Sequence, residues 1–161
     1  MFDALTAQSV SLRRSDFPLR RLDQAESVHA AGFVAALPEQ ARYRRFHRAM
    51  SPAMVHAHYR ALDWNSAIVL AWIEDGAMLG IAEVHPYQSP DGPEAEIALT
   101  LDSDADHIGQ PLMVSALSRA AAAGARRSWM LLCLPDSAQF GIARRLGARF
   151  DIAQDTFVFT H

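Results

Sequence analysis

The chain has 161 residues, of which half are hydrophobic and a fifth are charged, and its formal net charge is −3 at pH 7. This length and composition predict one globular domain over residues 1–161 and exclude a disordered chain. The basic excess of a nucleic-acid-binding protein is missing, and no apolar run approaches the roughly 18 residues of a membrane span. Cys133 is the only cysteine and the N-terminus lacks a secretory pattern, so we expect a reducing, cytoplasmic setting.

The first third of the chain predicts one short strand and two helices. Residues 9–13 alternate polar and apolar side chains, as in a strand. Asp23, with Glu26 three residues later, resembles the N-cap of a helix whose apolar stripe covers residues 24–37. An arginine-rich segment follows, and a Ser-Pro pair then opens a second helix over residues 54–62.

The middle of the chain predicts three strands, at residues 67–73, 78–85 and 94–101. Asp75 and Gly76 between the first two strands are a strong hairpin signal, because this pair adopts the tight turn that antiparallel strands need. The proline-rich residues 86–93 predict a loop between the second and third strands.

The last third predicts helices over 109–123 and 137–146, and strands at 129–134, 150–152 and 156–160. In the helix over 109–123, Pro111 falls in the first turn, where proline is tolerated, and Gly124 marks the end of the helix. Asp136 is the expected cap of the second helix, which ends before Gly147. Together these elements predict an α+β fold with a mixed sheet and about four helices.

The order of these elements resembles the GNAT-type N-acetyltransferase superfamily, and three stretches strengthen the resemblance. RYRRFHRAMSPAMVHAHY is similar to the segment that opens the GNAT domains of bacterial protein-lysine acetyltransferases. AEIALTLDSDADHIGQPLM is similar to the fourth strand and acyl-CoA loop of the family. DSAQFGIARRLGARF is similar to its last helix, with Asp136 where the family usually has asparagine.

The resemblance implies a twisted mixed sheet whose fourth and fifth strands splay apart around acetyl-CoA. The pantetheine would pair with the fourth strand, and the pyrophosphate would rest on backbone N–H groups at the following helix, where the helix dipole favours an anion. An amine acceptor would attack the thioester, with Glu96 as general base. The implied cofactor-binding residues are Leu99, Thr100, Leu101, Ile108, Gly109, Gln110 and Asp136.

The acyl-CoA loop nevertheless departs from the family pattern of Gln/Arg-x-x-Gly-x-Gly/Ala. Asp104 replaces the first polar or basic residue, His107 replaces one glycine, and only Gly109 is kept. A carboxylate pointing at a pyrophosphate adds repulsion of about 1 to 4 kcal/mol, which exceeds the ~0.3–1 kcal/mol of attraction from a helix N-terminus. Ala143 also stands where many members carry a tyrosine that protonates the leaving thiolate.

Other groups allow a functional or a structural interpretation. The arginine cluster, formed by Arg42, Arg44, Arg45 and Arg48, could meet an acidic substrate or the ribose phosphate of CoA, or form a solvated face. Asp102, Asp104 and Asp106 have the start of a calcium-loop spacing, but Met113 stands where a bidentate glutamate is needed. A solvated acidic loop is the simpler interpretation, so no metal site is predicted.

Two functions from different classes follow. The first is acetyl-CoA-dependent N-acetyl transfer to a primary amine of a small molecule or a protein, with Glu96 as base. Glu94 and Glu96 share one strand face, because side chains alternate along a strand. The second is a GNAT fold that has lost catalysis and acts as a binding or regulatory module, for example as a homodimer. Binding of acyl-CoA between the fourth and fifth strands distinguishes the two.

Overall fold

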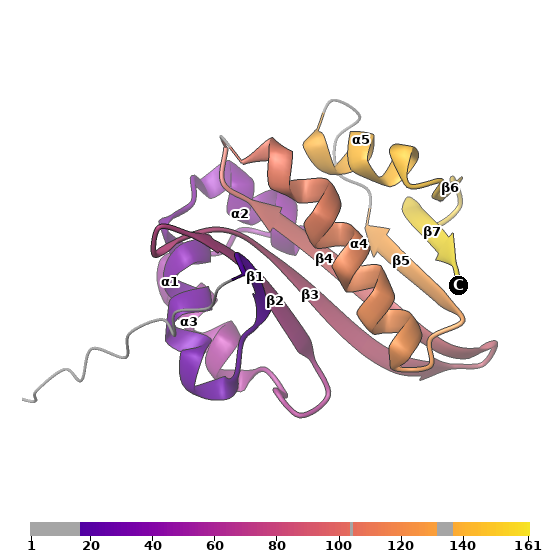
Figure 1. The fold of residues 1–161 in the computed structure, drawn as a ribbon, viewed down its shortest axis with the longest axis horizontal. Coiled ribbons are helices and arrows are strands. Elements are labelled where there is room, and N and C mark those ends of the chain that lie inside the picture. Colours follow the sequence, from indigo (N-terminus) through magenta and orange to yellow (C-terminus); the bar gives the residue numbers. More distant parts are fainter. Residues whose placement is uncertain (1–16, 104, 132–136) are drawn as a thin grey trace, which may run out of the picture.

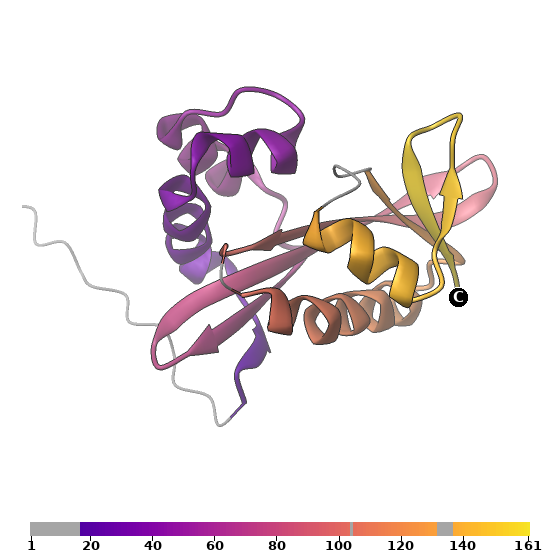
Figure 2. The ribbon, with the colours of Figure 1, turned by 90° about the horizontal axis from the view of Figure 1, so that it is seen from above.

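The computed structural model of the chain describes residues 17–103, 105–131 and 137–161. Within them, a mixed sheet lies between two layers of helices (Figures 1 and 2). The strands are β1 (Leu19–Arg21), β2 (Ile68–Glu74), β3 (Ala77–Ser89), β4 (Gly92–Leu101), β5 (Arg127–Leu131), β6 (Arg149–Asp151) and β7 (Thr156–Thr160). The helices are the short 3-10 turn η1 (Gln24–Glu26) and α1 (Ser27–Ala36), α2 (Glu39–Phe46), α3 (Pro52–Ala61), α4 (Asp106–Ala122) and α5 (Ala138–Arg145).

The sheet confirms the predicted α+β class. Its strand order is β1-β2-β3-β4-β5-β7-β6, and every neighbouring pair is antiparallel except β4 and β5. A parallel pair needs a crossover connection. Helix α4 supplies it, since it lies between β4 and β5 in the chain and packs on the sheet.

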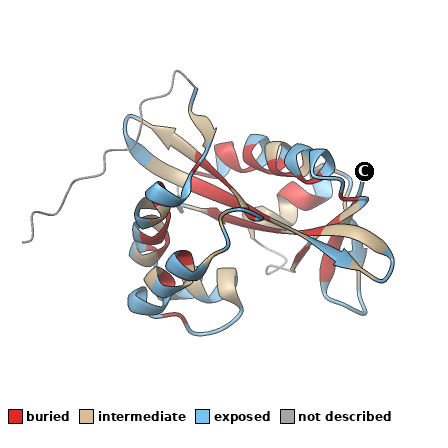
Figure 3. Cartoon of the chain, turned by 90° about the horizontal axis from the view of Figure 1, so that it is seen from below, coloured by how far each residue is buried: buried red, intermediate tan, exposed pale blue. Residues whose placement is uncertain are grey.

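Each face of the sheet has its own apolar core. On one face α1 and α3 pack against β2 and β3, with Val34, Tyr59 and Ile81 fully buried. On the other face α4 and α5 pack on β3, β4 and β7, with Ile97 and Leu112 buried among them. Figure 2 shows α1–α3 and α4–α5 on opposite sides of the sheet, and Figure 3 shows burial concentrated along its centre. The middle strands are therefore the rigid platform of the molecule.

The N-terminal elements match the prediction only in part. The Asp23 carboxylate accepts from the N–H of Glu26, and the Glu26 carboxylate accepts from the N–H of Asp23, each at 3.2 Å, which confirms the expected cap. Strand β1 was not predicted, and the strand expected at residues 9–13 lies outside the described residues. Helix α2 was also not predicted, because its sequence EQARYRRF carries no apolar stripe and none of its residues belongs to the fully buried core.

The β3–β4 hairpin is longer than predicted, because most of residues 86–93 are strand instead of loop. Pro86 lies opposite Ala95 in the ladder. Strand β2 pairs with β3 only as far as Val84, so Pro86 lies at an open edge, where proline is tolerated in a sheet. The Asp75-Gly76 turn joins β2 and β3 as predicted, with both residues at positive φ.

Helix α4 begins at Asp106, about one turn before the predicted start at Gly109. Pro111 therefore lies inside the helix and not in its first turn, which is a correction to the sequence prediction. An acidic residue at the start of a helix is favoured by the helix dipole, and Asp106 occupies that place. The earlier start brings the positive end of α4 next to the last residues of β4.

Candidate active site

Strands β4 and β5 diverge in the middle of the sheet. Their ladder has three pairs and ends at Glu96 opposite Trp129, although β4 continues to Leu101 and β5 to Leu131. Beyond Glu96, the side of β4 that faces β5 is therefore a strand edge with no ladder partner among the described residues. Unpaired N–H and C=O groups of this kind can bind an extended ligand as if it were another strand.

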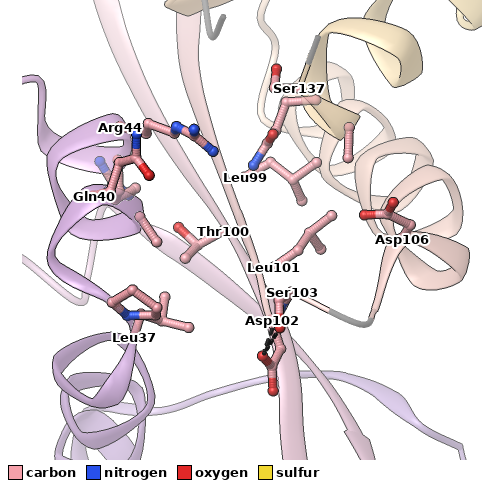
Figure 4. A pocket seen from close by; sticks show the side chains of 15 residues that line it. Leu37, Gln40, Arg44, Leu99, Thr100, Leu101, Asp102, Ser103, Asp106 and Ser137 are labelled. Carbon is pink, nitrogen blue, oxygen red and sulfur yellow. Dashed lines mark hydrogen bonds between the residues drawn. The ribbon is translucent and has the colours of Figure 1, made fainter.

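A pocket of about 360 Å³ lies along the second half of β4. Its walls come from the end of β4, the start of α4, the start of α5 and helix α2 with the turn before it (Figure 4). Leu99, Thr100 and Leu101 line it from β4, and Asp102 and Asp106 line it at its α4 end. The residues expected to hold the pantetheine thus lie together on one wall of a real cavity.

Thr100 is the polar group of that wall. Only 4% of the residue is exposed, and its hydroxyl has no hydrogen-bond partner among the residues that the structure describes. In Figure 4 this hydroxyl points across the pocket toward α2. Because a buried hydroxyl without a partner is costly, its place in a pocket wall indicates a contact that a ligand would complete.

The residues expected at the pyrophosphate are arranged differently. Ile108 is fully buried in the core, and Gly109 is buried beneath the pocket. A Cβ at Gly109 would clash with the side chains of Leu101 and Ile142, so this glycine is needed for close packing of α4 against α5 and β4. Gln110 is exposed and accepts from Arg145 Nε at 3.4 Å. Asp136 lies outside the described residues.

Four N–H groups in and next to the β4–α4 loop already donate hydrogen bonds within the chain. Asp102 N–H donates to the Leu79 carbonyl at 2.9 Å, and Ser103 N–H donates to the Asp102 carboxylate at 2.6 Å. The N–H groups of Ala105 and Ile108 donate to the carbonyls of Asp102 and Ala105, respectively, each at 3.1 Å. These four N–H groups are therefore not available to a phosphate, and two carboxylates lie in the same wall.

Glu96 lines a smaller hollow that continues from this pocket, since Arg44, Arg45 and Leu99 line both. Its carboxylate has no hydrogen bond or ion pair within the described ranges, so it is available to accept a proton. His47 lines the same hollow. Burial, and after it the charge of Arg45, lower the pKa of His47, so its imidazole is neutral at pH 7.

A buried charged cluster that the sequence analysis missed lies behind this hollow. Glu83 on β3 is fully buried and accepts from Tyr59 Oη at 2.7 Å and from Arg45 at 2.9 Å. His85 Nε2 is 3.3 Å from the Glu83 carboxylate, and His85 lies directly opposite Glu96 in the β3–β4 ladder. One signal was present in the sequence, because Glu83 interrupts an otherwise apolar strand.

Burial by itself would raise the pKa of Glu83, because it disfavours the charged form. The Arg45 guanidinium and the imidazole of His85 outweigh burial and hold the pKa of Glu83 well below its usual range. His58 Nε2 lies 3.8 Å from Glu83, which is too far for a hydrogen bond. Burial first, and then Glu83, raise the pKa of Tyr59 well above its usual value. The Glu83 carboxylate at the centre of the cluster is therefore ionised, and each of its two oxygens accepts from a donor.

A further cavity of about 450 Å³ lies over the paired part of β4 and β5, where Glu94, Arg127 and Trp129 line it. Tyr87 and Trp129 form its aromatic wall, with Trp129 Nε1 donating to Tyr87 Oη at 2.5 Å. Tyr87 in turn donates to Glu94 at 2.6 Å, and Arg127 pairs with Glu94. Leu131 lines both this cavity and the hollow of Glu96. Glu96 thus lies between two cavities that approach it along β4 and β5.

The remaining sequence candidates do not add to this site. Ala143 on α5 is fully buried in the apolar core between the helices and the sheet. His107 is exposed and does not line the pocket. Asp104 and Cys133 lie outside the described residues. Over residues 17–103, 105–131 and 137–161, no cluster of three or more His, Cys, Asp or Glu side chains could hold a metal ion. In the same ranges no helix has the length and apolarity to cross a membrane.

Comparison with known proteins places this geometry in a known fold. No family model and no curated protein matches the sequence. The GNAT domain of PAT from S. lividans superposes with a TM-score of 0.70 at 16% identity, over 89% of each chain. The acetyltransferase YncA of Salmonella typhimurium, solved with acetyl-CoA, gives 0.61 at 17% identity, over 83% of this chain and 80% of that one.

A third solved structure is the PaiA N-acetyltransferase of Thermoplasma acidophilum in complex with coenzyme A. It gives a TM-score of 0.60 at 15% identity and covers 89% of this chain and 98% of that one. At these identities the likeness establishes the fold alone. The chain has the GNAT acyl-CoA N-acyltransferase fold, which confirms the fold that its sequence predicted.

Proposed function

We propose that this protein is an acyl-CoA-dependent N-acyltransferase that transfers an acyl group, in the simplest case acetyl, to a primary amine. The observation that carries the proposal is the unpaired edge of β4, which begins at Glu96 and runs along a pocket of about 360 Å³. Solved neighbours with this fold contain acetyl-CoA or coenzyme A. Backbone groups of Leu99 to Leu101 would pair with the pantetheine, and the Thr100 hydroxyl would find its partner in the donor.

In the proposed reaction the amine nitrogen attacks the thioester carbonyl carbon. The C–N bond forms and the C–S bond breaks, and the thiolate leaves and takes up a proton. Glu96 takes one proton from the protonated amine and so frees the lone pair for attack, because its carboxylate has no partner among the described residues and lies where the strands diverge. The second proton that the nitrogen loses after the attack goes to the departing thiolate. His85, held by Glu83 and opposite Glu96, adds a polar group to the same face.

The amine would approach from the cavity of Tyr87 and Trp129, on the other side of Glu96 from the donor pocket. Asp91, Glu94 and Asp151 line this cavity with Arg127 and Arg149, so three acidic side chains face two basic ones. Aromatic faces and a small excess of negative charge suit a protonated amine. The acceptor would lose its proton as it moves to the neighbouring carboxylate of Glu96.

Calorimetric titration with acetyl-CoA tests the donor half of the proposal, and thiol release with a panel of amines tests the reaction. We expect binding tighter than about 100 μM, or roughly −5.5 kcal/mol. Glu96→Gln should retain that affinity and lower the acyl-transfer rate by about 10²- to 10⁴-fold, which is the usual contribution of a general base. Glu74→Gln, on β2 and away from the cavities, is the matched control and should leave the rate unchanged.

A second function, a non-catalytic binding module, is favoured by the β4–α4 loop. Its N–H groups at 102, 103, 105 and 108 already have partners, and Asp102 and Asp106 would repel a pyrophosphate. If acetyl-CoA does not bind at low salt, with or without calcium or magnesium, the acyltransferase proposal fails and this second function stands. If acetyl-CoA binds but no amine releases thiol and Glu96→Gln changes nothing, the fold binds the donor without catalysis.

A further inference from the structure

The three arginines of helix α2 have different environments, although they lie within four residues of one another. Arg42 is used by the fold, because its Nε donates to the Met50 carbonyl at 2.7 Å and its guanidinium also donates to the carbonyl of Leu37. Arg45 is used as well, through its buried ion pair with Glu83 at 2.9 Å. Neither side chain is available to a ligand.

Arg44 lies between them and is exposed. It makes no hydrogen bond or ion pair with any residue that the structure describes. It nevertheless lines both the pocket along β4 and the hollow of Glu96, and in Figure 4 its guanidinium extends from α2 over the pocket toward Leu99. An unpaired guanidinium in a cavity wall supplies a fixed positive charge and a fork of N–H donors that suit anionic oxygens.

Thr100 provides a second, independent observation on the opposite wall. Its hydroxyl is buried, has no partner within the described part of the chain, and points toward α2 across the pocket (Figure 4). The guanidinium of Arg44 can only donate, and the hydroxyl of Thr100 can donate as well. Acceptor oxygens of a ligand placed between β4 and α2 would satisfy both groups.

We propose that Arg44 and Thr100 together bind an anionic group of the thioester donor. This inference rests on the proposed acyltransferase function and deepens it, because it moves recognition of the donor's charge from the β4–α4 loop to helix α2. The N–H groups of residues 102, 103, 105 and 108 are already bonded within this chain, and the loop adds two carboxylates. Arg44 supplies the charge that the loop lacks.

Two sources of anionic oxygens fit this position. One is a phosphate of coenzyme A, and the other is a carboxylate at the end of a dicarboxylic acyl group such as succinyl. Both accept charge-assisted hydrogen bonds from a guanidinium in the same way. Arg44 adjoins the hollow of Glu96, where the acyl group would lie, as well as the pocket along Leu99 to Leu101, where the pantetheine would lie.

The test measures the affinities of the wild type, Arg44→Gln and Thr100→Val for acetyl-CoA, succinyl-CoA and acetyl-pantetheine, the last of which carries no phosphate. Arg48→Gln is the matched control, since Arg48 is exposed, lies four residues on and does not line the pocket. It removes the same formal charge from the same segment. Calorimetry at fixed ionic strength keeps the screening constant across all four proteins.

We expect Arg44→Gln to weaken binding of the preferred donor by about 10- to 100-fold, the range of a lost charge-assisted interaction, and Thr100→Val by about 3- to 10-fold. Arg48→Gln should change it less than about 2-fold. If the anion is a phosphate, Arg44→Gln weakens acetyl-CoA and succinyl-CoA equally and leaves acetyl-pantetheine unchanged. If it is an acyl carboxylate, the wild type prefers succinyl-CoA and only that preference is lost.

The inference is overturned if the wild type binds the CoA thioesters and Arg44→Gln binds all of them as well as Arg48→Gln does. That outcome leaves the proposed acyltransferase function intact. If the wild type binds none of the three thioesters, the proposed function itself fails and this inference fails with it. Because Arg44 is exposed and has no structural partner within the described residues, the variant is expected to fold normally, which circular dichroism verifies.

Discussion

Replacing Glu83 by glutamine is expected to destabilise the protein strongly, although the two side chains have nearly the same volume. Glu83 is fully buried, and its partner Arg45 has a side chain that is only 10% exposed. Without the carboxylate, the guanidinium stays buried without a compensating charge. Removing one partner of a buried ion pair costs about 3–5 kcal/mol, a large part of the roughly 5–15 kcal/mol that stabilises a whole domain.

The expected loss lowers the melting temperature by roughly 6–20 °C for a chain of this size, by the usual 2–4 °C per kcal/mol. Chemical denaturation measures the loss of unfolding free energy in Glu83→Gln, Arg45→Gln and the double variant, relative to the wild type. Glu39→Gln, at an exposed position, is the control. The double variant should lose less than the sum of the single losses, by about 1–3 kcal/mol. A loss below about 1 kcal/mol in Glu83→Gln would show that water reaches the pair, and the reasoning would be refuted.

The same pair predicts a pH dependence of stability. The pKa of Glu83 is lower in the folded protein than in the unfolded chain, because Arg45 and the nearby imidazoles favour the carboxylate despite burial. Its contribution is therefore fully present above the unfolded pKa of about 4.3 and is lost as pH falls toward the folded value. The difference in unfolding free energy between wild type and Glu83→Gln should shrink below about pH 4. A difference that is constant down to pH 3 would contradict this assignment.

Two further changes test the packing and the helix caps. Gly109→Ala should lower the free energy of unfolding by about 1–3 kcal/mol, because the new Cβ would meet the side chains of Leu101 and Ile142. Gly141→Ala is its control, since a Cβ there faces only the end of a flexible arginine side chain. That substitution should be neutral or stabilising by up to ~1 kcal/mol. Equal effects at the two glycines would contradict the packing argument. Ser51→Ala should cost about 1 kcal/mol in the same denaturation assay, since the Ser51 hydroxyl caps α3, and an unchanged midpoint would exclude a stabilising cap.

Local signals predicted most of the fold. The cap at Asp23, the Pro-opened α3 and the Asp75-Gly76 hairpin each depend on residues within a few positions of one another, so the sequence shows them directly. Helix α2 lacked such a signal, because it is held by arginines that bond to distant carbonyls and to Glu83. Pro86 suggested a loop, and only the register of β2 reveals that it lies at an open edge.

The sequence pointed to the residues of β4 that line the pocket, but not to the residues of other elements that face them. A period of two placed Glu94 and Glu96 on one strand face, and the same period puts Ala98 and Thr100 on that face, toward the helix layer that contains α2. What faces them depends on long-range packing, which spacing in the sequence does not encode. For this reason the cluster of four arginines looked uniform in sequence, and only the fold separates Arg44 from Arg42 and Arg45.

Arg44 and Glu83 are linked through the geometry of helix α2. Successive residues of a helix point about 100° apart, so fixing Arg45 against Glu83 also fixes the direction in which Arg44 leaves the helix. The buried pair therefore limits the motion of the wall that carries Arg44, and a fixed wall loses less conformational entropy when a ligand binds. A buried ion pair contributes little net stability compared with apolar packing, so the effect of this pair that bears on the site is the orientation of α2, whose residues line the pocket.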